Sequence, residues 1–221
     1  MITIKKNKEP ESLTRFRASG GKKFDDLDSE TKNDLRDALL KEQGYLCAYC
    51  MEQIGRNKDD RYKDVKIEHV IPRSITQTDP DANVRLLEIN YNNLVAVCNG
   101  VTNGHTHCDT SKKNTPISLN PCNSAVEQSI KYKTKDGTIS STNEEWNNDL
   151  DSAEKLNLNL PDIKGNRVTA ITELINYLNK NGNWSDSHLT RELEKLTDRT
   201  VKPPYLGVLK YYINRRLSRK K

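Results

Sequence analysis

Apolar residues recur with helical spacing in four separate segments of the chain. In the first segment, Leu35, Leu39 and Leu40 form a stripe that predicts a helix over residues 29–43. Ser29 can cap the start of this helix, and Gly44 can end it. We expect all four stripes to face a hydrophobic core, so we assign them no chemistry.

The other three stripes cover residues 171–178, 189–196 and 206–213. The first of these helices should stop at Asn181 and Gly182, and the second should begin at Ser185. Pro203 and Pro204 should open the third. The half of the chain that follows residue 125 is therefore predicted to be mainly helical.

Strand-like patterns are shorter and lie near the middle of the chain. Residues 65–71 and 94–97 are apolar enough to predict two strands, and the segment between them, rich in Asp, Asn, Thr and Pro, predicts a long loop. Residues 133–143 predict a turn or a small hairpin, and residues 1–26 are expected to be extended or irregular. The expected fold class is α+β, with an N-terminal arm and helix (1–44), a central core (45–124) and a helical C-terminal region (125–221).

Composition narrows the class of protein further. Apolar residues make up 33% of the chain and charged residues 30%, and no run approaches the roughly 20 apolar residues of a membrane-spanning helix. The N-terminal segment lacks the apolar stretch of a signal peptide, which predicts a cytoplasmic protein. In that compartment the five cysteines are expected to be metal ligands or free thiols rather than disulfides.

The net charge of +5 is concentrated at one end of the chain. Residues 202–221 contain no acidic residue and seven basic ones, namely Lys202, Lys210, Arg215, Arg216, Arg219, Lys220 and Lys221. Such an end can bind phosphates by releasing counterions. It can equally be a solvated helix end, where cations suit the helix dipole.

Four cysteines in the central core have the pattern of a metal site. Cys47 and Cys50 form a C-x2-C pair, whose two thiolates can reach one tetrahedral Zn²⁺ from a single tight turn. Cys98 and Cys108 form a wider second pair, and Asn103 and the glycines around it favour a bent loop there. We therefore predict a structural zinc held by all four cysteines.

Two other interpretations of this cluster remain open. His105 or His107 could replace Cys98 or Cys108 as a ligand, because both lie close to Cys108. A redox C-x2-C pair would need a βαβ pattern around it, and the sequence has none. Cys122 has no partner in the pattern and is expected to be an ordinary buried or free thiol.

Between the two cysteine pairs lies a second group of polar residues. Glu68 and His69 end the first apolar strand, Asn93 directly precedes the second, and Asp109 follows Cys108. A neutral imidazole suits the general base of phosphodiester cleavage, and carboxylates suit a hard divalent cation. Lys112, three residues after Asp109, could contact a phosphate or be a solvated helix residue.

These motifs together resemble the HNH endonucleases, which are built on a ββα-metal core. The resemblance implies that His69 is the general base, that Glu68 and Asp109 hold Mg²⁺ or Mn²⁺, and that Asn93 orients the His69 ring or fixes the turn beside it. Many HNH sites have Asp at the position of Glu68, and His or Asn at that of Asp109. Both replacements here are oxygen ligands, so metal binding survives the change.

The run from Ala38 to Cys50, with the motifs around His69 and Cys108, is similar to the PtuB subunits of Septu anti-phage systems, some of which accompany retrons. This resemblance implies a PtuA-type ABC ATPase partner, and in retron systems a reverse transcriptase with its RNA and DNA. DNA is the expected substrate, with RNA including tRNA as an alternative. Residues 145–200 would then dock the partner, with a larger nucleic-acid clamp as the alternative role of the C-terminal region. A different class of function, a catalytically silent zinc adaptor, would not need Glu68, His69, Asn93 and Asp109 together.

Overall fold

The structure is a computed structural model that describes residues 1–56, 62–63, 65–180 and 184–218. It is an α+β fold in which about half of the chain is helical. The predicted features at Asn181, Gly182 and residues 219–221 lie outside the described residues. The α-helices are α1 (Glu11–Ala18), α2 (Ser29–Gln43), α3 (Arg73–Thr78), α4 (Ala82–Arg85), α5 (Cys108–Lys112), α6 (Ser124–Ser129), α7 (Glu144–Asp151), α8 (Pro161–Lys180), α9 (Asp186–Thr197) and α10 (Leu206–Ser218).

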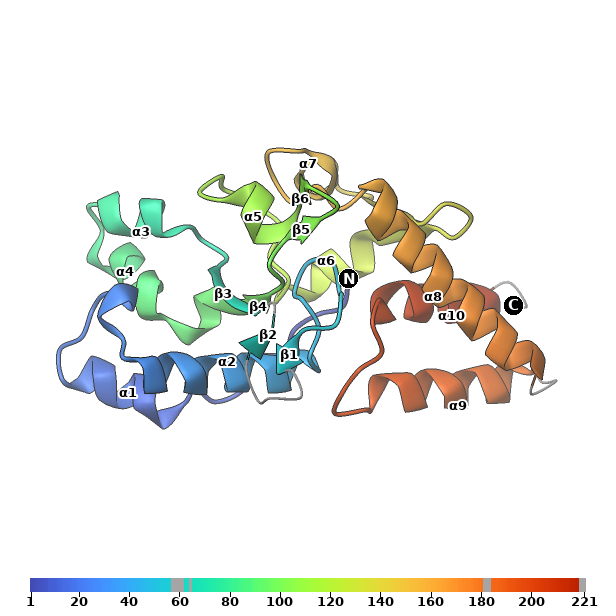
Figure 1. Cartoon of the computed structure of the whole chain (residues 1–221), viewed down its shortest axis with the longest axis horizontal. Coiled ribbons are helices and arrows are strands. Elements are labelled where there is room, and N and C mark those ends of the chain that lie inside the picture. Colours follow the sequence, from blue (N-terminus) through green and yellow to red (C-terminus); the bar gives the residue numbers. More distant parts are fainter. Residues whose placement is uncertain (57–61, 64, 181–183, 219–221) are drawn as a thin grey trace.

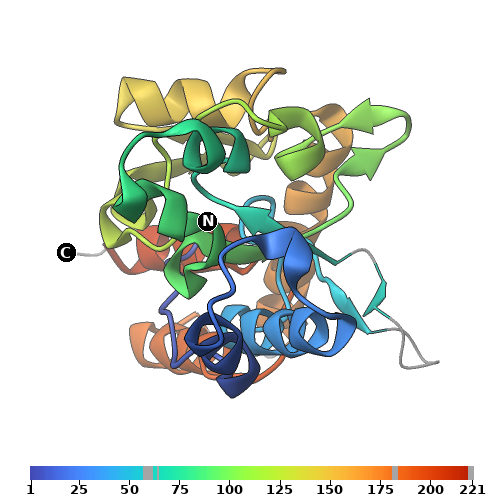
Figure 2. The same ribbon diagram turned by 90° about the vertical axis from the view of Figure 1, so that its left-hand side faces the viewer.

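The strands pair in sequence order as small antiparallel sheets. Of the residues described, the pairs are β1 (Gly55–Arg56) with β2 (Tyr62–Lys63), β3 (Lys66–His69) with β4 (Leu94–Val97), β5 (Val101–Thr102) with β6 (His105–Thr106), and β7 (Ile130–Lys133) with β8 (Thr138–Ser141). The β3–β4 pair is the centre of the fold, with His69 opposite Leu94. In the views of Figures 1 and 2, α2 lies on one side of this pair and α3 and α4 lie on the other.

Helix α2 supports the central pair through one buried amide. Asp28 accepts a hydrogen bond from Thr31 N–H and so caps the helix one residue before the predicted Ser29, while Gly44 ends it in the left-handed conformation, as predicted. The Gln43 side chain accepts from Ala96 N–H at 2.7 Å and donates to the Ala96 carbonyl at 2.8 Å. Because this amide pairs both backbone groups of one β4 residue, it fixes the helix against the sheet.

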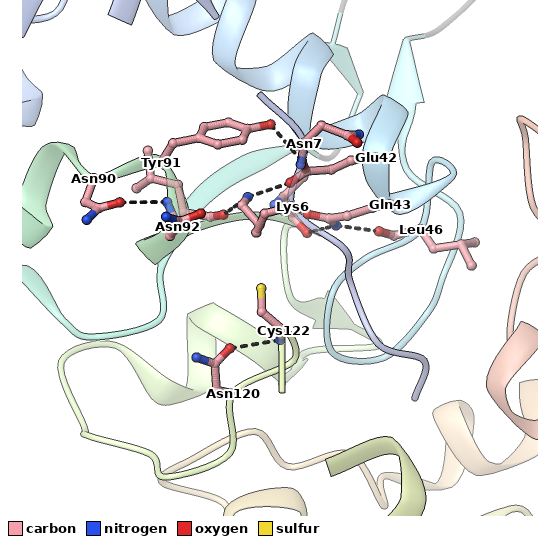
Figure 3. A network of polar contacts seen from close by, with 12 residues as sticks. Lys6, Asn7, Glu42, Gln43, Leu46, Asn90, Tyr91, Asn92, Asn120 and Cys122 are labelled. Atoms are coloured by element: carbon pink, nitrogen blue, oxygen red, sulfur yellow. Dashed lines mark hydrogen bonds and ion pairs between the residues drawn. The ribbon is translucent and has the colours of Figure 1, made fainter. Parts of the chain in front are cut away.

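A second polar network joins the N-terminal segment to the same two elements (Figure 3). The Lys6 ammonium binds the Glu42 carboxylate, donates to the Leu94 carbonyl at 2.8 Å and lies 3.9 Å from the centre of the Tyr91 ring. Tyr91 O–H and Asn7 N–H both donate to the other Glu42 oxygen. The Glu42 side chain is fully buried, and these donors satisfy it.

Two predictions about irregular segments are wrong. Residues 1–26 contain α1 and a 3₁₀ turn at Phe24–Asp26, and the segment between β3 and β4 contains α3, α4 and two 3₁₀ turns instead of a long loop. Local caps explain the second difference. The Asp81 and Asn90 side chains each accept a hydrogen bond from the N–H two residues later, and so start short helical turns in a polar sequence.

The predicted helices of the C-terminal region are confirmed. Helix α9 starts at Asp186 with Ser185 as its cap, and α10 starts at Leu206, after the two prolines. The predicted hairpin is β7–β8, and it begins three residues earlier than expected. One continuous hydrophobic core contains residues from all three predicted segments, for example Leu13, Tyr49 and Leu209. Among the helices that the structure describes, none is long and apolar enough to cross a lipid bilayer.

Candidate functional site

The first cysteine pair lies on a tight turn that follows α2. Leu46 pairs with Gln53 across the turn, Cys47 N–H donates to the Glu52 carbonyl at 2.9 Å, and Met51 N–H donates back to Cys47. Glu52 N–H points to the Cys50 sulfur at 3.5 Å, which is a bond that favours a thiolate. The turn therefore directs both sulfur atoms to one point.

The second pair reaches that point from the β5–β6 hairpin. Asn103 and Gly104 form its two-residue turn, and both have positive φ angles, as the sequence predicted for a bent loop. Gly100 also has a positive φ of 70°, and a Cβ atom there would lie 2.3 Å from the His107 carbonyl oxygen. Because of this close contact and the positive φ, only glycine fits this position. The contact arises because His107 N–H donates to the Gly100 carbonyl and so closes the loop that presents Cys108.

The four cysteines meet as predicted. Their sulfur atoms all lie within 4.8 Å of one another, and all four residues are buried. The Cys47–Cys108 and Cys50–Cys98 sulfur distances are 3.9 Å and 3.7 Å. A tetrahedral site with Zn–S bonds of about 2.3 Å requires sulfur–sulfur distances of about 3.8 Å. The four cysteines could therefore bind a metal such as zinc.

The two histidines near this cluster have different positions. His105 is exposed on β6, away from any buried ligand group, whereas His107 is buried. His107 Nδ1 lies 3.2 Å from the Cys108 sulfur and 4.0 Å from that of Cys98, and its Nε2 contacts the Thr102 hydroxyl. His107 could also join Cys98 and Glu52 in a second ligand group. The four-sulfur arrangement makes His107 a hydrogen-bonding neighbour of the thiolates.

His69 lies at the end of β3, and only 6% of its surface is exposed. Its Nε2 lies 2.9 Å from the backbone carbonyl oxygen of Glu88. A carbonyl can only accept, so Nε2 carries the proton of the neutral imidazole and Nδ1 carries the lone pair. The Phe24 ring packs edge-on against the imidazole, with ring centres 4.8 Å apart. Burial lowers the pKa of His69 to about 4, so the ring is neutral at physiological pH.

Glu68 and Asp109 lie next to each other on β3 and α5. Glu68 is buried, and the Asp109 side chain is 24% exposed. Burial raises the pKa of Glu68 to about 8, and although Lys112 opposes this shift, the negative charge of Asp109 adds to it. Within the described residues, Glu68, Asp109 and His69 do not form a three-ligand cluster like that of the cysteines. These side chains thus bring two carboxylates to one place, and Glu68 is already paired with the Lys112 ammonium at 2.6 Å.

Lys112 has neither of its predicted environments. Its side chain is fully buried, and its ammonium donates to Glu68 at 2.6 Å and lies 3.4 Å from the His69 carbonyl. It is therefore neither a solvated helix residue nor accessible to a phosphate. Instead it joins α5 to the end of β3.

This contact leads to a testable prediction. We expect Lys112→Met to lower the free energy of unfolding by about 3 kcal/mol at pH 9, because it leaves a buried carboxylate without its cation. The loss should be smaller at pH 6, where Glu68, with its pKa of about 8, keeps its proton. Urea unfolding at both pH values measures this, with Lys113→Met as the control. Equal losses at the two pH values would contradict the prediction.

Asn93 lies at the predicted turn and not beside the imidazole. Its side-chain oxygen accepts from Ile71 N–H at 2.8 Å, and its NH₂ group donates to the carbonyls of Ile71 and Leu87, both at 3.1 Å. Of the two roles considered for Asn93, the structure favours fixing the turn. The partner of the His69 ring is Glu88, which the sequence analysis missed because a backbone carbonyl leaves no signature in a sequence.

A cleft of about 400 Å³ contains the three candidate residues. It is lined by Glu68, His69 and Asp109 together with four basic side chains, those of Arg36, Lys66, Arg73 and Lys113. Lys66 lies 3.6 Å from Asp109, and Arg73 lies 2.6 Å from Asp25. The cations outnumber the acids on this wall, so the cleft suits an anionic ligand.

Comparisons with known proteins identify no relative of this chain. The chain matches no protein-family model, no curated protein and no solved structure.

Proposed function

We propose that this protein is a metal-dependent endonuclease that hydrolyses phosphodiester bonds of nucleic acid. The observation that carries the proposal is the state of His69. A carbonyl fixes its neutral tautomer, and it lies beside two carboxylates in a cleft lined by basic side chains. A neutral imidazole with one free lone pair is a suitable base for activating water.

Each residue of the cleft has a role in this proposal. His69 Nδ1 takes a proton from the attacking water, and the basic side chains bind the phosphates on either side of the scissile bond. Glu68 and Asp109 would hold Mg²⁺ or Mn²⁺. When bound, such a cation supplies positive charge to the phosphate and to the departing 3′ oxygen. Asn93 holds the turn that follows His69.

The order of elements supports an assignment to the HNH class. Strands β3 and β4 both precede helix α5 along the chain, with α3 and α4 between the two strands and the β5–β6 hairpin between β4 and α5, and the side chains of Lys66 and Lys112 join β3 to α5. This is the order expected of a ββα-metal core, with the cysteine cluster closing the loop around it. A role beside an ATPase in phage defence, as in Septu systems, rests on the sequence resemblance alone.

The proposal is tested by metal dependence. Protein that retains its zinc but has been treated with a mild chelator should not cut DNA or RNA until Mg²⁺ or Mn²⁺ is added. The products should carry 5′-phosphate and 3′-hydroxyl ends, because the 3′ oxygen departs. Asp109→Asn should lower the rate, whereas Asp198→Asn, a change at the exposed end of α9, should not. Sequencing the cut ends from total DNA and total RNA, with and without a co-expressed ATPase, identifies the substrate.

The alternative is a zinc-binding adaptor without catalytic activity. The cysteine cluster alone would favour it. It predicts one zinc per chain and no cleavage of either nucleic acid under any metal or partner condition, and that result would overturn the endonuclease proposal.

A further inference from the structure

Glu88 connects three parts of the structure at the back of the His69 ring. The residue lies on a 3₁₀ turn, Leu86–Ile89, and is 4% exposed. Its carbonyl oxygen accepts from His69 Nε2 at 2.9 Å. Its carboxylate accepts from Phe24 N–H at 3.1 Å and from the Gln77 side-chain amide at 3.2 Å.

These contacts form a closed ring. Glu88 binds the imidazole through its backbone and binds residue 24 through its side chain, and the Phe24 ring then packs edge-on against the same imidazole at 4.8 Å. Asp25, the next residue, pairs with Arg73 at 2.6 Å and so fastens the same turn to α3. The imidazole is thus held at one nitrogen and along one side by groups that Glu88 places.

Stability does not explain a carboxylate at this position. Burying a charge is costly unless it is paired, and in the part of the chain that the structure describes Glu88 has neutral N–H donors and forms no ion pair. Its two donors come from segments that are distant in the sequence, one before α2 and one in α3. A residue that joins these segments through hydrogen bonds is better explained by the need to hold something in place.

We infer that Glu88 is a positioning residue, which fixes the Nε2–H tautomer of His69 through its carbonyl and holds Phe24 against the ring through its carboxylate. This inference rests on the proposed role of His69 as a base and extends it. Misplacing a reacting group by about 1 Å can reduce a rate roughly 100-fold, so such a brace has a large effect on activity.

The test compares Glu88→Ala with Glu88→Gln. Gln keeps an oxygen that can accept from Phe24 and Gln77, whereas Ala removes it. Glu88→Ala keeps the backbone carbonyl but removes the carboxylate that anchors the turn to Phe24 and Gln77, so in ¹⁵N-labelled protein without substrate it should move the His69 ring signals, whereas Glu88→Gln should leave them close to those of the parent. Under conditions where the parent cuts, Glu88→Ala should lower kcat roughly tenfold or more with KM little changed, and Gln should restore most of the rate.

Phe24→Ala is the second variant, because Phe24 is only half-buried and its loss threatens folding less. It should move the His69 ring signals in the same direction as Glu88→Ala. Unchanged ring signals in both variants, or Gln behaving like Ala, would overturn the inference. The NMR signals are read without catalysis, so an inactive parent protein would refute the endonuclease proposal while leaving this test of Glu88 intact.

Discussion

Replacing His69 with alanine should reduce the cleavage rate by about 100-fold to 10,000-fold, which is the usual contribution of a general base. Among the described side chains that line the cleft, His69 is the only imidazole that could activate water. Zinc content should change little, because the four cysteines do not touch the ring. Single-turnover cleavage at saturating Mg²⁺ measures the rate.

His105→Ala is the matched control, because His105 is exposed on β6 and lies outside the cleft. It should cut like the parent. If His69→Ala retains the parental rate, alone and with any partner that activates the parent, His69 is not the base.

The burial of His69 also determines how the cleavage rate should depend on pH. The pKa of His69 is lowered to about 4, so the base stays unprotonated well below the usual imidazole value of 6.5. The parental rate should therefore not fall between pH 7 and pH 5.5 through protonation of this group. The lowered pKa also means that the folded state binds this proton less readily than the unfolded state, so stability falls as the pH drops from 6.5 towards 4.

Much of the site could be predicted from the sequence because several of its residues are close to one another along the chain. Cys47 and Cys50 lie in one turn, and Glu68 and His69 lie at one strand end, so local geometry was enough to place each pair. The convergence of Cys98 and Cys108 on the first pair was also expected, since zinc chemistry demands four ligands.

What could not be predicted depends on contacts between distant segments. Glu88 reaches His69 through its backbone, which any residue could do, and Phe24 reaches it from a turn before α2. Lys112 was misjudged because a lysine after a helical Asp is usually solvated, whereas here it enters the core to meet Glu68. The polar segment between β3 and β4 is a different case, because its short helices start at local caps formed by the Asp81 and Asn90 side chains.

Loss of the metal should have the largest effect on stability. Cys47→Ser or a strong chelator should remove the bound zinc and unfold the central core, because the cluster joins the turn after α2 to the β5–β6 hairpin. In small zinc domains the metal contributes on the order of 10 kcal/mol, and part of that should be lost here. Metal analysis and thermal unfolding of the purified variant measure both effects.

Cys122 provides the control for this experiment. It is a half-buried thiol outside the cluster, so Cys122→Ser should keep one zinc and the parental melting temperature. His107→Ala separates a ligand from a neighbour, because removing a hydrogen-bonding neighbour should leave one zinc bound with weaker affinity. A Cys47→Ser protein that still held one zinc and melted like the parent would show that the four sulfurs are not the ligand set. The Glu52, Cys98 and His107 group would then be the next candidate, because it shares only Cys98 with the cluster.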